Sequence, residues 1–400
     1  MVTIQSDSYS IFIRKIGYSV GLENSLRRVR DLVDLYSREK DITPAAWKQL
    51  VHSPEPQGWG LDTDHIADFF KELDLIQRTK SDITILPGLD AMALAQLELG
   101  RNASFDLALR LAFASSIILA DGDIFLNFLA GEFERDRVEP LLRDMILTKR
   151  KAIKKVIKVP QIIARIFKRV AIDVQPTNVG GAAVGKSLSE KKRTEPLRFR
   201  TTPLNHVVED DQVHISDDYF RKVSGRRRDW AKSIDLCDEK GRQTELGHSL
   251  IAAFKELGIG TDAGAFSYWP FSFELERLAL SPQTLGVPSL GMWDHLIAVR
   301  KGLKLDKAGF ADRNSFDPSS VEELIRGLYR NYRILNSRRV MLRKEMPLNV
   351  LYTALVAIYS ARGKALLEMR TFLRALVDKP NSQFLYRSSR HYEGTLYIKD

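Results

Sequence analysis

The pattern of apolar and polar positions along the chain is mainly that of amphipathic helices. Residues 24–52 contain two such periodic stretches, "SLRRVRDLVDLYSR" and "ITPAAWKQLVHS". Residues 89–158 read as helix throughout, with a junction at Asp121-Gly122-Asp123. Three further helical stretches and a long hairpin with two apolar strands follow in residues 317–400. The chain is therefore predicted to be mainly helical.

One pattern occurs twice, in residues 69–88 and in residues 230–247. Each copy begins with an aromatic residue, has a lysine two positions later, and then shows an apolar–Asp–Leu–apolar step. A polar turn follows, and a returning Thr-x-Leu ends at or near a glycine. This order predicts a helix that stops at the Asp-Leu step and is followed by a short hairpin.

These elements predict a mainly α fold with small β-hairpins, in which tandem winged helix-turn-helix modules are joined by helical segments. Thr43 and Asp62 stand where the helix N-caps of the first module are expected. The predicted division is a winged-helix module (1–88), a helical region ending in a basic helix (89–170), a basic Gly-rich linker (171–213), a second winged-helix-like module (214–260), an aromatic, Gly- and Pro-rich connector (261–316) and a C-terminal winged-helix module (317–400).

Charge is concentrated in one part of the chain. The formal net charge of the 400 residues is +10, yet residues 149–200 hold fifteen Lys or Arg against three acids. Such a concentration attracts phosphates or acidic surfaces. The single cysteine, Cys237, excludes an internal disulfide framework and favours the reducing cytoplasm. The most apolar stretch, 111–120, is about half of what a membrane span needs, so no membrane association is expected.

A phosphate-binding loop is the first catalytic reading to consider, because Gly180, Gly185, Lys186 and Ser187 have the required spacing. The loop needs an apolar strand before it and a packed helix after it. Downstream, "SLSEKKRTEP" supplies one leucine and then charge, which cannot bury a helix face. A flexible basic linker is the favoured interpretation, and nucleotide binding through Lys186 stays open as an alternative.

Other catalytic constellations are weaker. The seven histidines do not fall at metal-ligand spacing with Cys237 or with one another on a single helix. The acidic residues of Asp238-Glu239-Lys240 fall in a predicted hairpin turn, where such residues are common. Asp121 and Asp123 could ligate a cation, but an Asp-Gly-Asp more often ends one helix and caps the next. We therefore predict no catalytic residue, no metal site and no cofactor.

Contact with nucleic acid is predicted where cations lie on the expected helices and hairpins, since phosphates are contacted by Lys and Arg. The second module's helix is expected to begin near "GRRRDWAK", which would place its arginines at the end that meets the major groove. The C-terminal module offers arginines on its last helix and at its hairpin, and a basic helix within 147–170 adds lysines. The candidate contacts are Arg226, Arg227, Arg228, Lys232, Arg370, Arg374, Arg387, Arg390, Lys151, Lys154, Lys155 and Lys158.

The first module differs, because its third helix is acidic: Asp62, Asp64, Asp68, Glu72 and Asp74 stand against Lys71 alone. A phosphate backbone would repel this helix. We expect the first module to dock a protein partner instead.

The run "RRRDWAKSIDLCDEKGRQTELGHSL" (226–250) resembles winged-helix segments of bacterial restriction and phage-defence proteins. The resemblance covers about a third of the chain and implies a recognition or scaffold subunit, with cutting or ATP hydrolysis done by another polypeptide. The leading hypothesis is a cytoplasmic, non-catalytic subunit of a multi-protein antiviral assembly that binds double-stranded DNA or RNA. The alternatives are a divergent nuclease or nucleotide-binding subunit, a pure interaction scaffold, and a transcription regulator.

Overall fold

The computed structural model describes residues 9–13, 24–61, 66–79, 81–156, 172–176, 198–201, 206–208, 217–270, 289–290, 292–305, 319–337, 345–365, 367–378, 382–387 and 394–398. These residues are mostly helical, with small sheets, which confirms the predicted fold class at this level. They belong to two compact units, one made of 1–18 and 117–302 and the other of 19–116 and 303–400. The six-segment division made from the sequence is finer and stays a prediction.

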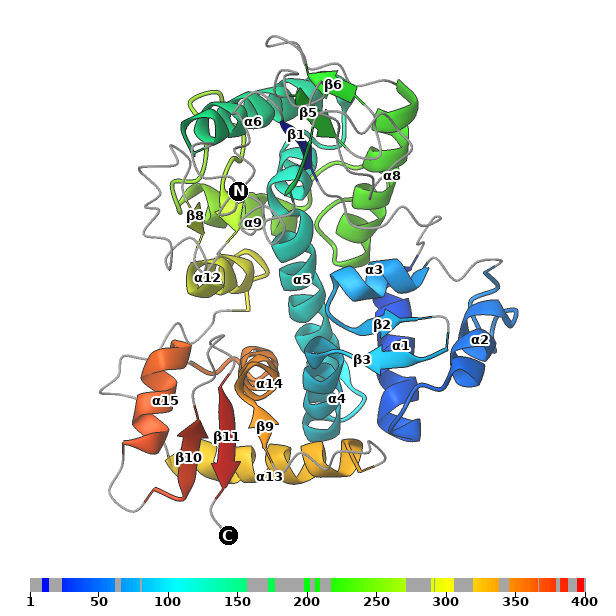
Figure 1. The fold of residues 1–400 in the computed structure, drawn as a ribbon, viewed down its shortest axis with the longest axis vertical. Helices are drawn as coiled ribbons and strands as arrows, with labels where there is room; N and C mark the ends of the chain where they lie inside the picture. Colours follow the sequence, from blue (N-terminus) through cyan, green and yellow to red (C-terminus); the bar gives the residue numbers. More distant parts are fainter. Residues whose placement is uncertain are drawn as a thin grey trace. The chain divides into compact units, whose positions relative to one another are not determined.

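The first unit combines helices with two sheets (Figure 1). Its elements are β1 (Tyr9–Ile13), the end of α5 (Ala103–Ala130), α6 (Arg135–Val156), β4 (Ile172–Pro176), β5 (Arg198–Thr201), β6 (His206–Val208), α8 (Asp217–Ser233), α9 (Glu245–Lys255), β7 (Trp269–Pro270), β8 (Ser289–Leu290) and α12 (Met292–Gly302).

The second unit contains helices from both ends of the chain and two small antiparallel sheets. Its elements are α1 (Ser25–Glu39), α2 (Pro44–His52), α3 (Ile66–Glu72), β2 (Ile76–Arg78), β3 (Ile83–Ile85), α4 (Pro87–Leu99), the start of α5, α13 (Ser319–Leu335), β9 (Met346–Pro347), α14 (Leu348–Ala361), α15 (Met369–Val377), β10 (Phe384–Arg387) and β11 (Thr395–Ile398).

The largest sheet was not expected from the sequence. Its strands have the order β4-β1-β5-β6, and β1 pairs antiparallel with β4 but parallel with β5. The segment 171–213, expected to be a flexible linker, therefore contributes three strands, and residues 9–13 pair with it rather than with the first predicted module. Such pairings join segments far apart in the chain, so no local pattern signals them.

The core of the second unit is built around α4. Residues 89–96 of this helix are all buried, as expected of a helix that is apolar on every side and packed within a protein. It packs against α14, α1 and α13. The one acid in its first turn, Asp90, is buried and accepts a hydrogen bond of 2.6 Å from the Tyr36 hydroxyl of α1. The N- and C-terminal parts of the chain thus share one core.

The sequence repeat is a repeat of local structure. Two residues after the end of α3 and of α8 comes an aspartate in the left-handed conformation, Asp74 at φ 59° and Asp235 at φ 60°. In both copies the N–H of the following leucine bonds the carbonyl oxygen five residues back, at 2.9 Å in the first and 2.8 Å in the second. The N–H of the aspartate bonds the carbonyl oxygen three residues back, at 3.0 Å in both copies. These two bonds together are the Schellman ending of a helix, and the predicted stop at the Asp-Leu step is confirmed.

The glycine that closes each copy has a steric role. A Cβ on Gly88 would lie 2.6 Å from the Asp74 carbonyl oxygen, and a Cβ on Gly247 would lie 2.1 Å from the Leu236 carbonyl oxygen. Only glycine lets the returning chain approach the helix end this closely. The first hairpin is the antiparallel pair β2–β3, whereas the second is reduced to one bridge, Cys237 to Gln243.

One of the two predicted helix caps of the first module agrees with the structure. Thr43 caps α2, because its side chain accepts a hydrogen bond of 3.2 Å from the N–H of Ala46. Thr244 was expected in the returning strand of the second copy, but it caps α9 instead, because its side chain accepts a hydrogen bond from the N–H of Gly247. Asp62, the other predicted cap, lies outside the described residues.

The helix α5 contains the predicted junction. Asp121 has φ −137° and ψ 16°, which are non-helical, and the helix is kinked there. No single helix of the described segments is long and apolar enough to cross a membrane, although the two parts of α5 on either side of the kink pass this test together.

The C-terminal part of the second unit has the element order α13–β9–α14–α15–β10–β11 (Figure 1). The three predicted helices and the predicted hairpin are present, and the short strand β9 was not predicted. The sheet order is β10-β11-β9, so β11 lies between the other two strands and pairs antiparallel with each. We call residues 317–400 the C-terminal module.

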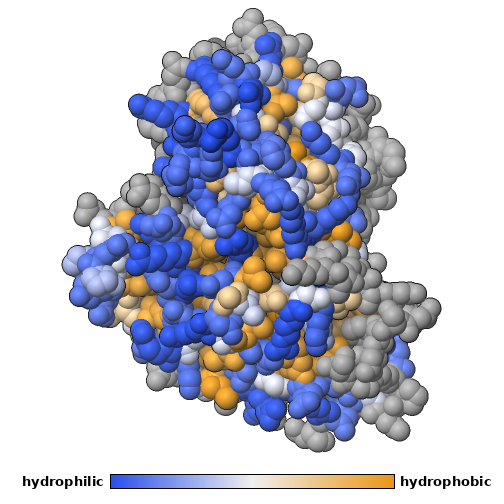
Figure 2. Space-filling model, turned by 180° about the vertical axis from the view of Figure 1, so that it is seen from behind, coloured by the Kyte–Doolittle hydropathy of each residue, from blue (hydrophilic) through white to orange (hydrophobic). Residues whose placement is uncertain are grey.

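The face of the molecule seen in Figure 2 is covered largely by polar and charged side chains, with apolar patches between them. The large apolar side chains that are most exposed among the described residues are Leu97 on α4, Ile334 on α13 and Leu385 on β10. Only Leu385 shares an element with a predicted nucleic-acid contact, Arg387.

Candidate nucleic-acid interface

The helix α8 begins earlier than expected, and this changes where its arginines lie. It starts at Asp217, and residues 217–225 form one continuous helix with the arginine run. Arg226, Arg227 and Arg228 therefore lie in its C-terminal half and Lys232 in its last turn. The prediction that these cations occupy the N-terminal end of a reading helix is wrong.

Arg227 is not available to a ligand, which corrects its prediction as a nucleic-acid contact. Its side chain is 2% exposed, and Nε and Nη2 each donate a hydrogen bond of 2.6 Å to the Asp121 carboxylate. The guanidinium carbon also lies 5.3 Å from the ring centroid of Phe128 and 5.8 Å from that of Trp230. Both charges are buried, and such pairs are tolerated only when geometry and hydrogen bonding are good. Arg227 ties α8 to the kink of α5.

The kink also leaves little room for the cation site considered from the sequence. Both oxygens of Asp121 bond Arg227, and one oxygen of Asp123 accepts a hydrogen bond of 3.0 Å from the N–H of Ile124. Burial, together with these two aspartates, raises the pKa of Tyr268 well above its ordinary value, so its hydroxyl stays protonated. No group of three or more potential metal ligands occurs among the described residues.

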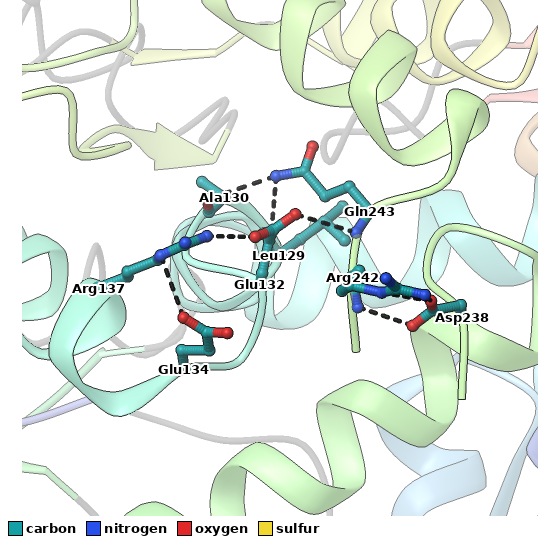
Figure 3. Close-up of polar contacts among 8 residues, drawn as sticks. All are labelled: Leu129, Ala130, Glu132, Glu134, Arg137, Asp238, Arg242 and Gln243. Atoms are coloured by element: carbon teal, nitrogen blue, oxygen red, sulfur yellow. Dashed lines mark hydrogen bonds and ion pairs between the residues drawn. The ribbon is translucent and has the colours of Figure 1, made fainter. Parts of the chain in front are cut away.

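The hairpin of the second copy is fastened to the end of α5 (Figure 3). The Gln243 side-chain amide donates to the carbonyl oxygens of Leu129 at 3.1 Å and Ala130 at 3.4 Å, which lie in the last turn of the helix. Such carbonyls lack partners within their own helix and need one from outside. The Glu132 carboxylate accepts from the N–H of Gln243 at 3.4 Å and is paired with Arg137.

The turn of this hairpin contains the acidic residues of Asp238-Glu239-Lys240, which were weighed as catalytic candidates from the sequence. Asp238 accepts hydrogen bonds of 2.9 Å from the N–H groups of Lys240 and Arg242 and one of 2.8 Å from Nε of Arg242. Burial opposes ionisation of Asp238, but these hydrogen bonds outweigh it and lower its pKa. The carboxylate therefore closes the turn, as expected for an aspartate in such a position.

The second copy is less basic than its arginine run suggests. Residues 217–258 contain nine Lys or Arg and eight Asp or Glu. Lys232 pairs with Glu239 at 2.5 Å, and this hydrogen bond raises the pKa of Lys232, while Arg242 pairs with Asp238. With Arg227 buried, Arg228 is the exposed cation of the predicted triplet, and Arg226 is half-buried.

The C-terminal module is basic, with fifteen Lys or Arg against eight Asp or Glu in residues 317–400. Arg374 is exposed in the last turn of α15. The Arg387 side chain is 75% exposed at the end of β10, and its guanidinium carbon lies 5.4 Å from the ring centroid of Tyr397. Its Nη1 is 3.8 Å from an oxygen of Glu345. These two arginines are the predicted contacts of this module that the structure places at the surface.

The remaining predicted contacts cannot be compared with the structure. Lys158 and Arg390 lie outside the described residues, as does the segment 177–197 with the phosphate-loop match. The backbone is described, but not the side chain, for Arg370 in α15 and for Lys151, Lys154 and Lys155 in α6.

Sequence reasoning missed two side-chain groupings. The ion pair of Arg227 with Asp121 spans 106 positions, and the hydrogen bond of Tyr397 to Glu345 spans 52. The only signal for the first was an Asp-Gly-Asp at a helix junction, which does not identify a partner. No signal in the sequence indicated Glu345. No family model matches the chain, and no curated protein or solved structure was found to be similar to it.

Proposed function

We propose that this chain is a non-catalytic subunit of a multi-protein assembly that binds double-stranded DNA, and that the C-terminal module makes the DNA contact. The observation that carries the proposal is the combination of element order and exposed cations in this module. A winged helix-turn-helix is expected to have the element order helix, strand, two helices and two strands, with the last strand in the middle of the sheet. The C-terminal module has this order.

In a helix-turn-helix the second helix of the motif lies in the major groove, and here that helix is α15. It carries Arg370 and Arg374 four positions apart, which is one turn of a helix. The hairpin β10–β11 is the wing, and a basic wing suits contact with phosphates or with the minor groove. Arg387 is the last residue of β10 and pairs with Thr395, so it lies at the end of the wing next to the hairpin turn.

The second copy is a weaker candidate, because its cations are largely paired with acids or buried. We assign it a structural role and retain Arg228 as its one candidate contact. The first copy, with exposed Asp68 and Asp74 at α3, is proposed to dock a protein partner. We further propose that the chain acts in the cytoplasm and that its assembly is an antiviral one.

The experiment is a fluorescence-anisotropy titration of the full chain into a short labelled duplex over a range of NaCl concentrations. Arg374→Glu and Arg387→Glu should each weaken binding, and each lost phosphate contact should lower the slope of log K against log salt by about 0.9. Lys255→Glu is the control, since it makes the same change in net charge at an exposed lysine of α9.

The result separates the alternatives. Equal effects of all three substitutions would mean that only overall charge matters, and the C-terminal module would lose its role. If Arg228→Glu alone abolished binding, the DNA contact would belong to the second copy. A wild-type chain that bound no duplex but captured a protein partner would be a scaffold, and saturable ATP binding lost in Lys186→Ala would indicate a nucleotide-binding subunit.

A further inference from the structure

The outer face of the C-terminal sheet follows from strand register. Glu345 precedes β9, whose pairing with β11 sets Met346 opposite Leu396, and β10 pairs Arg387 with Thr395 and Leu385 with Tyr397. Side chains alternate between the two faces of a sheet. Three residues of the inner face, Met346, Leu396 and Phe384, are almost fully buried. Glu345, Thr395, Tyr397 and Arg387 therefore share the outer face.

The Glu345 carboxylate accepts hydrogen bonds from two other residues of this face. One carboxylate oxygen accepts a hydrogen bond of 3.0 Å from the Thr395 hydroxyl, and the other accepts one from the Tyr397 hydroxyl. The hydrogen bond to Glu345 raises the pKa of Tyr397, so the phenol remains a donor at neutral pH. The carboxylate is thus held in place by two strand side chains.

Arg387 lies next to Glu345 without being hydrogen-bonded to it. Its Nη1 is 3.8 Å from the Glu345 oxygen that Tyr397 also bonds, which is an ion-pair distance but beyond a hydrogen bond. Its guanidinium stacks over the Tyr397 ring at 5.4 Å. The cation is therefore positioned by attraction and stacking, while three quarters of its side chain stays accessible.

We propose that Glu345 is a positioning residue for DNA binding: it holds Arg387 against the outer sheet face and competes with DNA phosphate for its charge. The inference rests on the proposed function. Phosphate neutralisation supplies the sequence-independent part of DNA affinity, so a carboxylate beside the arginine lowers that part. Glu345 would thereby reduce the affinity of the module for duplexes of any sequence.

The test is a double-mutant cycle in the same anisotropy titration, with Glu345→Gln, Arg387→Gln and the combined variant. Gln keeps an oxygen that can accept from Thr395 or Tyr397 and removes the charge. Exposed ion pairs are weak, so Glu345→Gln should tighten binding by about two- to fivefold and steepen the salt slope. In the Arg387→Gln background this gain should disappear.

Two further variants separate a local effect from net charge and from folding. Glu323→Gln removes an exposed carboxylate of α13 in the same module and should give less than half of the gain. Glu345→Asp keeps the charge and should bind like the wild type. Thermal melting checks that each variant is folded.

The outcomes are distinct. If the wild type binds duplex DNA but Glu345→Gln gives no gain, or gives the same gain without Arg387, the role of Glu345 is refuted and the proposed function stands. If the wild type binds no duplex under any salt condition, both proposals fall.

Discussion

Replacing Arg227 by methionine should destabilise the first unit by about 3–5 kcal/mol, because the change removes the guanidinium from the buried Asp121 carboxylate. Arg227 and Asp121 are each only 1% exposed, so water cannot take over the lost interaction. Methionine keeps much of the unbranched stem of arginine, which limits any cavity. The loss therefore measures the buried charge rather than packing.

The magnitude follows from the contacts. Two charge-assisted hydrogen bonds of 2.6 Å are lost, each worth about 1.5–3 kcal/mol. Contact of the cation with the rings of Phe128 and Trp230 adds about 0.5–2 kcal/mol. These terms share one guanidinium and are not additive, which keeps the expectation near 3–5 kcal/mol. Adding Asp121→Asn to Arg227→Met removes the buried charge, so the double variant should be more stable than Arg227→Met alone.

The assay is urea unfolding followed by near-ultraviolet circular dichroism and by tryptophan fluorescence, to which the buried Trp230 contributes beside the pair. Arg228→Met is the matched control, since this neighbour is exposed and its loss should change stability by less than about 0.5 kcal/mol. Equal unfolding midpoints for Arg227→Met and Arg228→Met would refute the reasoning from burial. Reversing the charge of all three arginines together would therefore test folding before it tested DNA binding.

Five further outcomes are expected from the second copy. Gly247→Ala should destabilise the chain by about 2–3 kcal/mol, since its Cβ would lie 2.1 Å from the Leu236 carbonyl oxygen. The same substitution at Gly225, which has nothing within 4 Å of its Cβ inside α8, should stabilise it by up to about 1 kcal/mol, and urea midpoints of the two variants should move in opposite directions. Thr244→Ala removes the cap of α9 and should cost about 1 kcal/mol in the same assay, unless the N–H of Gly247 finds another acceptor. Burial raises the pKa of Cys237 from 9.0 to about 12, so a disulfide reagent at pH 8 should modify the thiol only after unfolding, and rapid reaction of the folded chain would contradict its burial. Because the folded pKa is the higher one, this thiol contributes stability below about pH 9 that is lost as the pH rises toward 12, and the urea midpoint of the wild type should fall more over this window than that of Cys237→Ala.

The repeat shows which structural features can be predicted from local sequence. The helix stop at the Asp-Leu step, the turn and the closing glycine were predicted because the interactions that form them join residues close together in the chain. The hydrogen bonds that end α3 and α8 span five residues, so the sequence of each copy contains what is needed. The cap at Thr43 was predicted for the same reason.

The arginine run shows a feature that local sequence does not predict, the burial of individual side chains. Consecutive residues of a helix point about 100° apart, so Arg226, Arg227 and Arg228 cannot share an environment. Nothing in the run itself says which of them is buried, because that depends on Asp121 of another helix. Charge counted along the sequence therefore overstated the cationic surface of this copy.

The sequence by itself determined the helical class, the positions of most helices, the hairpins β2–β3 and β10–β11 and the local endings of the repeat, since all of these depend on periodicity and on contacts within a few residues. Only the tertiary structure decided that β1 joins β4 and β5, that Arg227 neutralises Asp121, and that Glu345 faces Arg387 on one sheet face. Each of these closes a long loop, and its energy depends on burial and on a partner that the neighbouring residues do not specify.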